Sequence, residues 1–370
     1  MTLHARSPSR RQDPQRSGVR IDATRMKNRT PGLYLLSLAL PLSTLIFLVT
    51  GPYRWFTAVL WLAAPAVLVA LDGHRGDARR DPPARLSPGS FDALLYLHAA
   101  IQLANVVLMA RLVSRGSGIT ADRIAAALLV GIGSAYSGVV VAHELIHRRS
   151  AAARWIGRVL LSTALYDHFF TEHLRGHHLR VATAEDPVTA RLGEDFWTYV
   201  RRAWPGEFLS AWNIEIQRRS GHGSVQALIR NGVVHGLVVE MALGFGLWWV
   251  FGLAALVFFL IQAAVAHVFI YAVNYFQHWG LLRSRRKVSP ADSWESDSLL
   301  TDFTLLGLAR HADHHAVASK PYQQLRHLDA SPRLPRGYFG MVMLVLFRNA
   351  EAQRLMTDEL RRVGLRSSAA

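Results

Sequence analysis

Residues 171–178 read TEHLRGHH and place three histidines within six residues. On a helix, His173 and His177 stand four positions apart on one face, and His178 adds a neighbouring imidazole. Neutral imidazole is the commonest metal ligand in proteins and suits iron, zinc, copper and nickel. The stretch therefore predicts a metal site, and the rest of the chain can be examined for further ligands.

Three other short segments carry histidines at similar spacing. HELIHRR at 143–149 holds a pair four positions apart, HADHH at 311–315 holds three, and NYFQHWG at 274–280 holds one. Nine of the seventeen histidines thus fall in four clusters. Nine are too many for one ion, so the pattern predicts two metals. The nine are His143, His147, His173, His177, His178, His278, His311, His314 and His315.

The composition indicates a membrane protein. Of the 370 residues, 51% are hydrophobic and only 18% are charged, although the net charge is +16. Such a low charged fraction is unusual for a soluble chain of this length. There is no cysteine, which excludes disulfides, thiolate-bound zinc, iron–sulfur clusters and a fused rubredoxin.

Six apolar runs predict an all-α integral membrane protein with six transmembrane helices. Each run is just long enough to cross a bilayer core at roughly 1.5 Å per residue. Short connections join them into three hairpins, so both termini lie on one side. The predicted spans are 33–50, 55–71, 94–113, 124–142, 233–251 and 253–273.

The distribution of basic residues predicts which side the termini occupy. Residues 1–30 hold eight Lys or Arg, and the connection 72–93 holds four more, whereas the opposite connections hold only Arg54, Arg115 and Arg123. By the positive-inside tendency both termini are cytoplasmic. All nine histidines then lie at or beyond the cytoplasmic ends of the spans, which predicts one site on that face.

The chain is predicted to form one membrane domain, 31–350, between two tails. Residues 1–30 are expected to be a disordered basic tail, within which Met26 is an alternative start, and 351–370 a C-terminal tail. Residues 153–170 are amphipathic and predict a helix at the membrane interface. Residues 338–347 are expected to dip back into that interface.

Other readings of the histidines compete with a two-metal enzyme. His-Glu-x-x-His also describes zinc proteases, but three further clusters on one face disfavour that reading. A metal transporter would place its ligands within the spans.

The remaining histidines divide into predicted solvated residues and predicted structural ones. The former are His4, His74, His222 and His327, and the latter are His98, His168, His235 and His267.

Four motifs resemble those of the alkane 1-monooxygenase family, within the membrane di-iron superfamily of fatty acid desaturases and hydroxylases. They are EHLRGHHLRVATAEDP at 172–187, NYFQHWGLLR at 274–283, LARHADHH at 308–315 and YQQLR at 322–326. The resemblance covers about residues 30–350. HELIHRR and NYFQH are closer to the hydroxylase component of xylene monooxygenase, and Gln277 replaces the glutamate usual in alkane hydroxylases, which leaves the substrate open.

The resemblance implies two iron ions held by the nine histidines, with O₂ as co-substrate. It implies hydroxylation of the terminal carbon of an alkane that enters from lipid, in a bacterial inner membrane and without any nucleic acid partner. A xylene or toluene methyl monooxygenase and a lipid acyl desaturase or hydroxylase are the alternatives. Four carboxylates are expected to orient the histidine rings. They are Glu144, Glu172, Asp186 and Asp313.

Electrons are expected to come from a separate rubredoxin or ferredoxin-type carrier with its reductase. The chain has no cysteine for such a centre, and no nucleotide-binding fingerprint follows a strand. Basic residues near the ligands predict a docking surface for an acidic carrier, or else for anionic lipid. They are Arg148, Arg149, Arg175, Arg180, Arg283, Arg285, Arg286, Lys287, Arg310 and Lys320.

Two predictions concern side chains inside the spans. Trp61, with Trp55 before it, is expected to lie along the substrate channel and to plug its far end, because it is bulky and followed by several alanines; packing against lipid is the alternative. Glu240 and His267 lie at similar depths on the fifth and sixth spans. Because a lone carboxylate is costly there, they are predicted to be hydrogen-bonded partners.

Overall fold

The computed structural model describes residues 30–72, 88–116, 118–221, 224–283 and 286–364. These residues form helices, and the only β pairing among them is an isolated bridge between Glu295 and Arg333. The first half comprises α2 (Thr30–Leu33), η1 (Tyr34–Leu38), α3 (Ala39–Thr50), α4 (Trp55–Trp61), α5 (Ala63–Leu71), α6 (Pro88–Val113), α7 (Ala121–Gly133), η2 (Ser134–Val139), α8 (Val140–Ile146), α9 (Ala151–Thr163), α10 (Phe169–Glu172), η3 (His173–His177) and α11 (His178–Arg180). The second half comprises α12 (Phe196–Arg218), α13 (Ser224–Ile229), α14 (Gly232–Phe251), α15 (Leu253–His278), η4 (Pro290–Asp292), α16 (Leu299–Thr304), η5 (Leu308–Arg310), α17 (His311–Ala316), η6 (Tyr322–Gln324), α18 (Tyr338–Phe347) and α19 (Asn349–Arg362).

Four of the predicted spans are helices long and apolar enough to cross a membrane. They are Pro88–Val113, Ala121–Ile146, Gly232–Phe251 and Leu253–His278. Three of these have 26 residues, or about 39 Å at 1.5 Å per residue. The first two predicted spans are the shorter apolar helices Tyr34–Thr50 and Trp55–Leu71, and the second of them is interrupted at Leu62, between α4 and α5.

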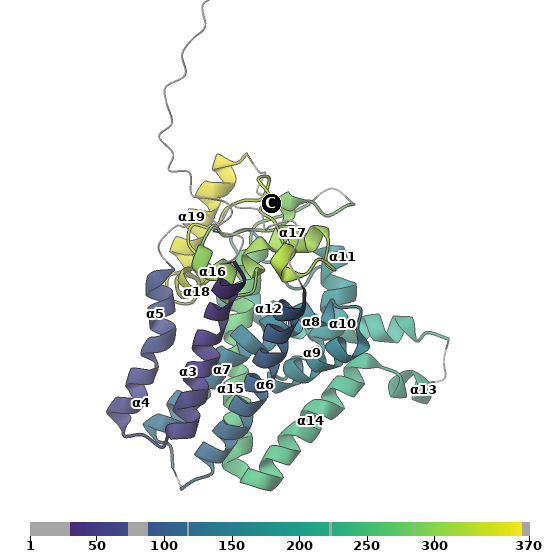
Figure 1. The fold of residues 1–370 in the computed structure, drawn as a ribbon. Helices are drawn as coiled ribbons and strands as arrows, with labels where there is room; N and C mark the ends of the chain where they lie inside the picture. Colours follow the sequence, from purple (N-terminus) through teal and green to yellow (C-terminus); the bar gives the residue numbers. More distant parts are fainter. Residues whose placement is uncertain (1–29, 73–87, 117, 222–223, 284–285, 365–370) are drawn as a thin grey trace, which may run out of the picture.

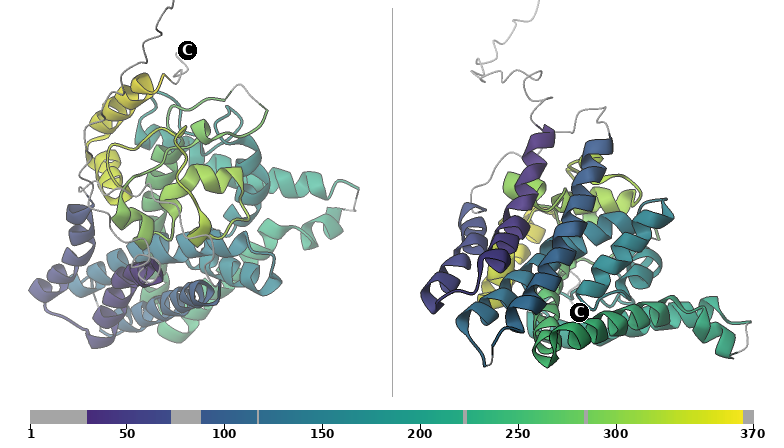
Figure 2. Two further views of the ribbon diagram at one scale, coloured as in Figure 1. Left: turned by 45° about the horizontal axis from the view of Figure 1, so that its top comes forward. Right: turned by 60° about the horizontal axis from the view of Figure 1, so that its bottom comes forward.

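The long helices lie side by side, with the histidine-bearing helix α17 at one end and the α14–α15 turn at the other (Figure 1). Helices α7 and α15 approach closely at Gly131, where an added Cβ would lie 2.6 Å from Cβ of Val265. Small residues allow such approaches between apolar helices. The end of α12 and all of α13 project from the side of this bundle (Figure 2).

Buried polar side chains tie the helices together near the middle of the bundle. Gln102 on α6 donates to Ser134 Oγ at 2.7 Å, and Ser134 donates to Gln262 Oε1 on α15 at 2.7 Å. Gln262 in turn donates to the Thr163 carbonyl at 2.7 Å, at the end of α9. Interhelical hydrogen bonds of this kind replace the hydrophobic driving force that lipid does not supply.

Asp72, directly after α5, fixes that helix to the C-terminal region. Its carboxylate accepts hydrogen bonds from the hydroxyls of Ser298 (2.5 Å) and Thr301 (2.9 Å). It also accepts from the backbone N–H groups of Phe339 (2.8 Å) and Gly340 (3.2 Å), in the first turn of α18. The N-terminus of a helix favours a negative charge, so Asp72 holds α5 beside α18.

The predicted hydrogen bond between Glu240 and His267 is wrong. Glu240 Oε1 accepts from the backbone N–H of Asp167 at 2.9 Å, and His267 Nε2 bonds to the carbonyl of Ala164 at 2.9 Å. The α9–α10 connection therefore lies between the two side chains and satisfies both of them. The sequence placed their depths correctly but could not show that a third segment intervenes.

The other histidines outside the four clusters differ in their surroundings. His98 Nε2 lies 2.7 Å from Ser37 Oγ, and His235 Nε2 bonds to the Ile229 carbonyl at 2.6 Å, as expected for structural residues. His168 is buried and its Nε2 has no hydrogen-bond partner. His4, His74 and His222 lie outside the described residues.

A candidate metal centre at the end of an apolar cavity

Four elements bring the nine predicted histidines into one cluster. Helix α8 and the residue directly after it carry two, η3 and the start of α11 carry three, the end of α15 carries one, and α17 carries three. The apolar run of α15 continues to His278, which places this ring at the end of a long helix. Adjacent rings in the cluster have centroids as close as 4.3 Å.

The cluster divides into two sets, each with the geometry of a metal site. One set contains His143, His147, His173 and His314, and the other His177, His278, His311 and His315; within each set the candidate ligand atoms lie within 4.8 Å of one another. His178 adjoins the first set, because its Nε2 lies 3.3 Å from Nε2 of His147 and 3.1 Å from Nε2 of His173.

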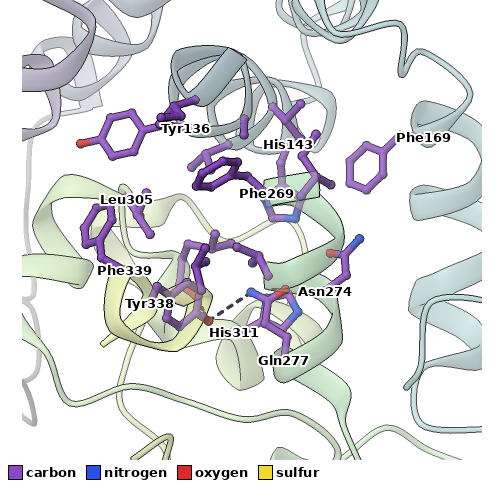
Figure 3. Close-up of a pocket in the computed structure, with 18 of the residues that line it drawn as sticks. Tyr136, His143, Phe169, Phe269, Asn274, Gln277, Leu305, His311, Tyr338 and Phe339 are labelled. Carbon is purple, nitrogen blue, oxygen red and sulfur yellow. Dashed lines mark hydrogen bonds between the residues drawn. The ribbon is translucent and has the colours of Figure 1, made fainter. Parts of the chain in front are cut away.

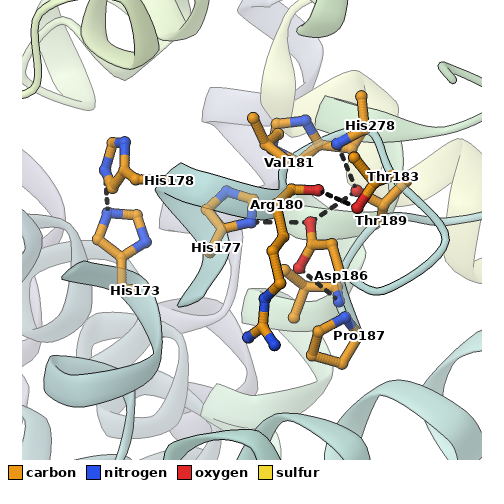
Figure 4. Close-up of polar contacts among 12 residues, drawn as sticks. His173, His177, His178, Arg180, Val181, Thr183, Asp186, Pro187, Thr189 and His278 are labelled. Atoms are coloured by element: carbon orange, nitrogen blue, oxygen red, sulfur yellow. Dashed lines mark hydrogen bonds and ion pairs between the residues drawn. The ribbon is translucent and has the colours of Figure 1, made fainter. Parts of the chain in front are cut away.

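A π-helical turn separates His173 from His177. Segment η3 is a π-helix, in which residues five apart, rather than four, come into register. His173 therefore meets His178, and His177 turns towards Asp186 (Figure 4). The sequence predicted His173 and His177 on one face of an α-helix; the structure assigns them to different sets, because the wider turn rotates the later ring away.

The spacing of the ring nitrogens fits a metal. Nε2 of His147 lies 3.0 Å from Nε2 of His173, and Nε2 of His311 lies 3.0 Å from Nε2 of His315. Two ligands each about 2.1 Å from an ion, at right angles, would stand about 3 Å apart. Nε2 of His143 and of His314 is buried without a hydrogen-bond partner. Buried nitrogens without partners are costly, and an ion would satisfy them.

Burial keeps most of these imidazoles in the neutral form that binds metals. It lowers the pKa of His147 to about 4. It also lowers the pKa values of His173, His178, His311, His314 and His315 well below the ordinary value, with help from neighbouring histidines. Desolvation penalises the charged form of a histidine. The rings therefore stay neutral, and their nitrogens can bind metal cations instead of protons.

Asp186 holds the ring of His177. Its Oδ2 lies 3.0 Å from His177 Nδ1 and accepts from the Thr189 hydroxyl at 2.6 Å (Figure 4). Burial alone would lower the pKa of His177, but the charge and hydrogen bond of Asp186, together with the charges of Glu172 and Glu207, outweigh burial and raise that pKa. The hydrogen bond leaves Nε2 facing the cluster, which is the usual arrangement for a metal-binding histidine.

The other three predicted carboxylates bind basic residues instead of histidine rings. Among the described residues, Asp186 is the one carboxylate of the four with a hydrogen bond to a histidine of the cluster. The other ion pairs are Glu144–Arg148 at 2.8 Å, Glu172–Arg180 at 2.8 Å and Asp313–Lys320 at 2.6 Å.

An apolar cavity of about 310 Å³ ends at the cluster (Figure 3). Its inner end includes the rings of His143, His173, His177 and His311. The remaining wall comes mainly from apolar side chains of α5, η2, α15 and α18, among them Leu68, Val139, Phe269, Val273, Phe339 and Met343. Such a space suits a hydrocarbon chain better than a polar substrate.

The sequence analysis did not find one polar residue of the cavity wall, Glu207. Glu207 on α12 accepts from the hydroxyls of Tyr166 (2.8 Å) and Tyr271 (2.6 Å), and burial together with the nearby charge of Glu172 raises its pKa to about 8. No histidine lies near Glu207 in the sequence, so no local signal marked it. Gln277 also lines the cavity and donates to the hydroxyl of Tyr338 at 3.1 Å.

The predicted channel tryptophans lie elsewhere. Among the described residues, neither Trp61 nor Trp55 is part of the cavity wall. Trp61 packs on Phe47, with ring centroids 5.9 Å apart, and Trp55 is 70% exposed. The part of the second predicted span that lines the cavity is α5, through residues such as Pro65 and Val69.

Two predicted surface residues are buried. Arg310 is only 4% exposed and pairs with Asp302 at 3.1 Å, so it cannot belong to a docking surface. His327 is not solvated, because its side chain is 7% exposed and its Nε2 lies 2.6 Å from Arg333. Arg149, Arg286 and Lys287 are exposed, and Arg285 lies outside the described residues.

Comparison with known proteins assigns the family. The model of the fatty acid desaturase family matches residues 123–344. Alkane 1-monooxygenase 1 of Pseudomonas aeruginosa is 41% identical over 215 residues, an alignment that spans 56% of each chain and thus little more than half of the relative's length. Alkane 1-monooxygenase 1 of Alcanivorax borkumensis is 33% identical over 335 residues, or 86% of this chain and 82% of the relative. The hydroxylase component of a Pseudomonas putida xylene/toluene monooxygenase is 24% identical over 196 residues, 53% of each chain. The chain therefore belongs to the alkane 1-monooxygenase family, within the fatty acid desaturase superfamily.

Proposed function

We propose that the protein is a membrane non-haem di-iron monooxygenase that converts the terminal methyl group of an alkane to a primary alcohol. The observation that carries this proposal is the convergence of two histidine sets on the inner end of an apolar cavity. When bound, two irons would supply reductive activation of O₂ for C–H hydroxylation. The overall reaction consumes the alkane, O₂, two electrons and two protons, and yields the alcohol and water.

The nine histidines would hold the irons, four in each set, with His178 beside the first set. Asp186 would keep His177 in one orientation. The apolar wall would admit one end of a chain and exclude water from the reacting carbon. Because the histidines occupy the inner end of this space, a terminal carbon would reach them first.

We infer that the chain crosses a bacterial inner membrane six times, with both termini and the histidines on the cytoplasmic side. The four long apolar helices and the two shorter ones, Tyr34–Thr50 and Trp55–Leu71, support six crossings. The excess of Lys and Arg in residues 1–30 supports the orientation. Reporter fusions in the connections at 114–120 and 72–93, which should lie on opposite sides, would test it.

A separate rubredoxin or ferredoxin-type carrier with its reductase would supply the electrons. The absence of cysteine from the sequence supports a separate carrier. The exposed basic residues Arg149, Arg286 and Lys287 follow shortly after histidines of the cluster in the sequence and would attract an acidic protein.

A methyl-arene substrate is the second candidate. Gln277 occupies the cavity wall beside His278, and the surrounding motif is closer to that of xylene monooxygenase than to that of most alkane hydroxylases. The distant similarity to a xylene/toluene monooxygenase component points the same way.

The test is expression in a host without its own hydroxylase, supplied with octane, dodecane, toluene or xylenes and followed by product chromatography. We expect 1-alkanols from the wild type. His143→Ala and His314→Ala should abolish them and reduce bound iron, because each removes a predicted ligand. His235→Ala, at an exposed histidine away from the cluster, should retain activity. Full activity with zinc in place of iron would refute the di-iron assignment.

A further inference from the structure

Arginines from three separate elements meet where α14 begins. Gly232, the first residue of α14, joins them: its carbonyl accepts from Nη2 of Arg158 at 2.8 Å, and its N–H donates to Oε2 of Glu215 at 3.0 Å. Glu215 in turn pairs with Arg218 at 2.6 Å and with Arg219 at 3.5 Å. The arginine cluster comprises Arg158 on α9, Arg175 in η3, Arg218 at the end of α12 and Arg219 directly after it.

The arginine cluster contains more positive charge than its own acids neutralise. Two carboxylates pair with its four guanidinium groups: Asp167 with Arg158 at 2.6 Å, and Glu215 with the two arginines of α12. Arg175 has no hydrogen-bond or ion-pair partner among the residues that the structure describes. Its Nη1 is buried, as is Nε of Arg219, which also lacks a partner. Buried donors without acceptors are costly, so the cluster has room for an anion.

Aromatic rings hold the guanidinium groups in place. The ring centroid of Phe170 lies 5.0 Å from Cζ of Arg158 and 5.6 Å from Cζ of Arg175. Arg158 also lies over Trp155, at 5.4 Å from its ring centroid, and this tryptophan is 55% exposed. Contacts of a cation with an aromatic face are favourable, so both arginines are oriented before any ligand arrives.

The arginine cluster lies at the depth of lipid headgroups. Helix α14 is long and apolar enough to cross a membrane, and the cluster surrounds its first residue, where the polar layer of a bilayer begins. Exposed tryptophan is typical of the same layer. Further along α14, the apolar side chains of Val238, Met241 and Phe245 are exposed. A ligand with a phosphate at the cluster and acyl chains along α14 would match both surfaces.

We propose that the arginine cluster is a binding site for the phosphate of an anionic phospholipid. Guanidinium groups bind phosphate oxygens through paired hydrogen bonds, and basic pockets beside membrane helices recognise such headgroups. The excess of positive charge disfavours the cationic headgroup of phosphatidylcholine. Because Arg175 lies between His173 and His177, the lipid would also anchor the turn that separates the two histidine sets. This site is independent of the proposed reaction, since its occupancy can be measured without turnover.

Titration of the full-length protein in dodecyl maltoside tests the proposal. The ligands are dioctanoylphosphatidylglycerol, dioctanoylphosphatidylcholine and inorganic phosphate, and we expect the phosphatidylglycerol to bind most tightly. Arg175→Gln should raise its dissociation constant about tenfold, because a charge-assisted hydrogen bond is lost. Arg175→Lys, which keeps the charge but not the paired geometry, should retain part of the affinity. Arg354→Gln removes an exposed charge on α19 and is the matched control.

A second variant separates lipid binding from damage to the metal centre. Arg219→Gln lies outside the histidine motifs and should weaken phosphatidylglycerol binding in the same direction, with unchanged iron content and melting temperature. Equal affinity for the two lipids, or wild-type affinity in both glutamine variants, would overturn the inference. Inorganic phosphate that binds as tightly as the lipid would also overturn it and indicate a site for a free anion. Loss of rubredoxin binding in Arg175→Gln, with lipid binding intact, would instead assign the cluster to the carrier.

Discussion

Asp186 is the residue on which the orientation of His177 depends. Asp186→Asn keeps the size of the side chain but removes the charge that faces His177 Nδ1 at 3.0 Å. Loss of such a partner typically weakens metal binding about 10- to 100-fold. We expect iron titration of the purified protein to show a decrease in this range, with a matching loss of activity. Asp329→Asn, at a side chain that is 98% exposed, should bind iron like the wild type.

Acidification should destabilise the metal-free protein. Burial lowers the pKa of His147 to about 4, whereas a histidine in the unfolded chain has a pKa of about 6.5. Below about pH 6.5 the unfolded chain therefore binds more protons than the folded one, so the free energy of unfolding falls as the pH falls towards 4. His177, whose pKa is raised, acts in the opposite direction but is outnumbered by the histidines whose pKa values are lowered.

Thermal denaturation of the chelator-treated protein between pH 8 and pH 5 would measure this effect. The melting temperature should decrease through the lower half of the range. A melting temperature that stays constant or rises would show that the cluster does not favour neutral imidazoles. Iron-loaded protein is the control, since bound metal competes with protons for the same nitrogens.

At the scale of the helices, the close contact of α7 with α15 predicts that a larger residue at Gly131 lowers the stability of the protein. Gly131→Ala would place a Cβ 2.6 Å from Val265 Cβ and 2.8 Å from the Gln262 carbonyl. Forcing atoms into such a contact typically costs 1–3 kcal/mol, to order of magnitude. We expect a lower melting temperature and reduced yield. Gly246→Ala, on α14 where no atom lies within 4 Å of the added Cβ, should leave the melting temperature unchanged or slightly raised.

Helices and ligands differ in how far the sequence determines them. The apolar runs predicted the positions of the long helices, because hydrophobicity is a property of each segment alone. Their ends differ by a few residues: the helix of the predicted span 253–273 extends to His278, and the helix of the predicted span 94–113 begins at Pro88. The separation of His177 from His173 could not be predicted in this way, because it depends on a π-helical turn. Glu207 comes from a helix without any ligand and enters the cavity only through tertiary packing.

The sequence shows where basic residues cluster, but it does not show which of them are exposed, because exposure depends on tertiary packing. Clusters of arginine near the histidines are visible in the sequence, but only the structure separates exposed Arg149 from Arg310, which is buried against Asp302. Likewise, Glu240 and His267 have the predicted depth but different partners, because the segment 164–167 lies between them. Pairings between distant segments are a property of the whole molecule.

For the whole molecule, the strongest prediction concerns the exposed basic residues. If Arg286 and Lys287 steer an acidic carrier, turnover at limiting rubredoxin should fall as ionic strength rises, because the Debye length is about 10 Å at 0.1 M and shrinks with added salt. The double variant Arg286→Glu, Lys287→Glu should raise the apparent KM for the carrier several-fold and leave the iron content unchanged.

A charge reversal elsewhere provides the control. Arg54→Glu changes an exposed residue in the turn between α3 and α4, at the opposite end of the bundle, and should not alter the KM for the carrier. Salt-independent turnover, together with wild-type kinetics of the double variant, would show that the carrier does not dock on this surface. Anionic lipid would then be the expected partner of these basic residues.

The four donors that hold Asp72 have a consequence for biosynthesis. They lie between 226 and 268 positions after it in the chain, so a ribosome that has already synthesised α5 must still translate most of the protein before this helix can be fixed. His315, the last of the nine histidines, is completed before α18 begins at Tyr338. A nascent chain arrested between these two points would contain every predicted ligand but would lack the part of the cavity wall that α18 supplies. Translation thus finishes the ligand set before it finishes the cavity, and a late stop codon would separate the two.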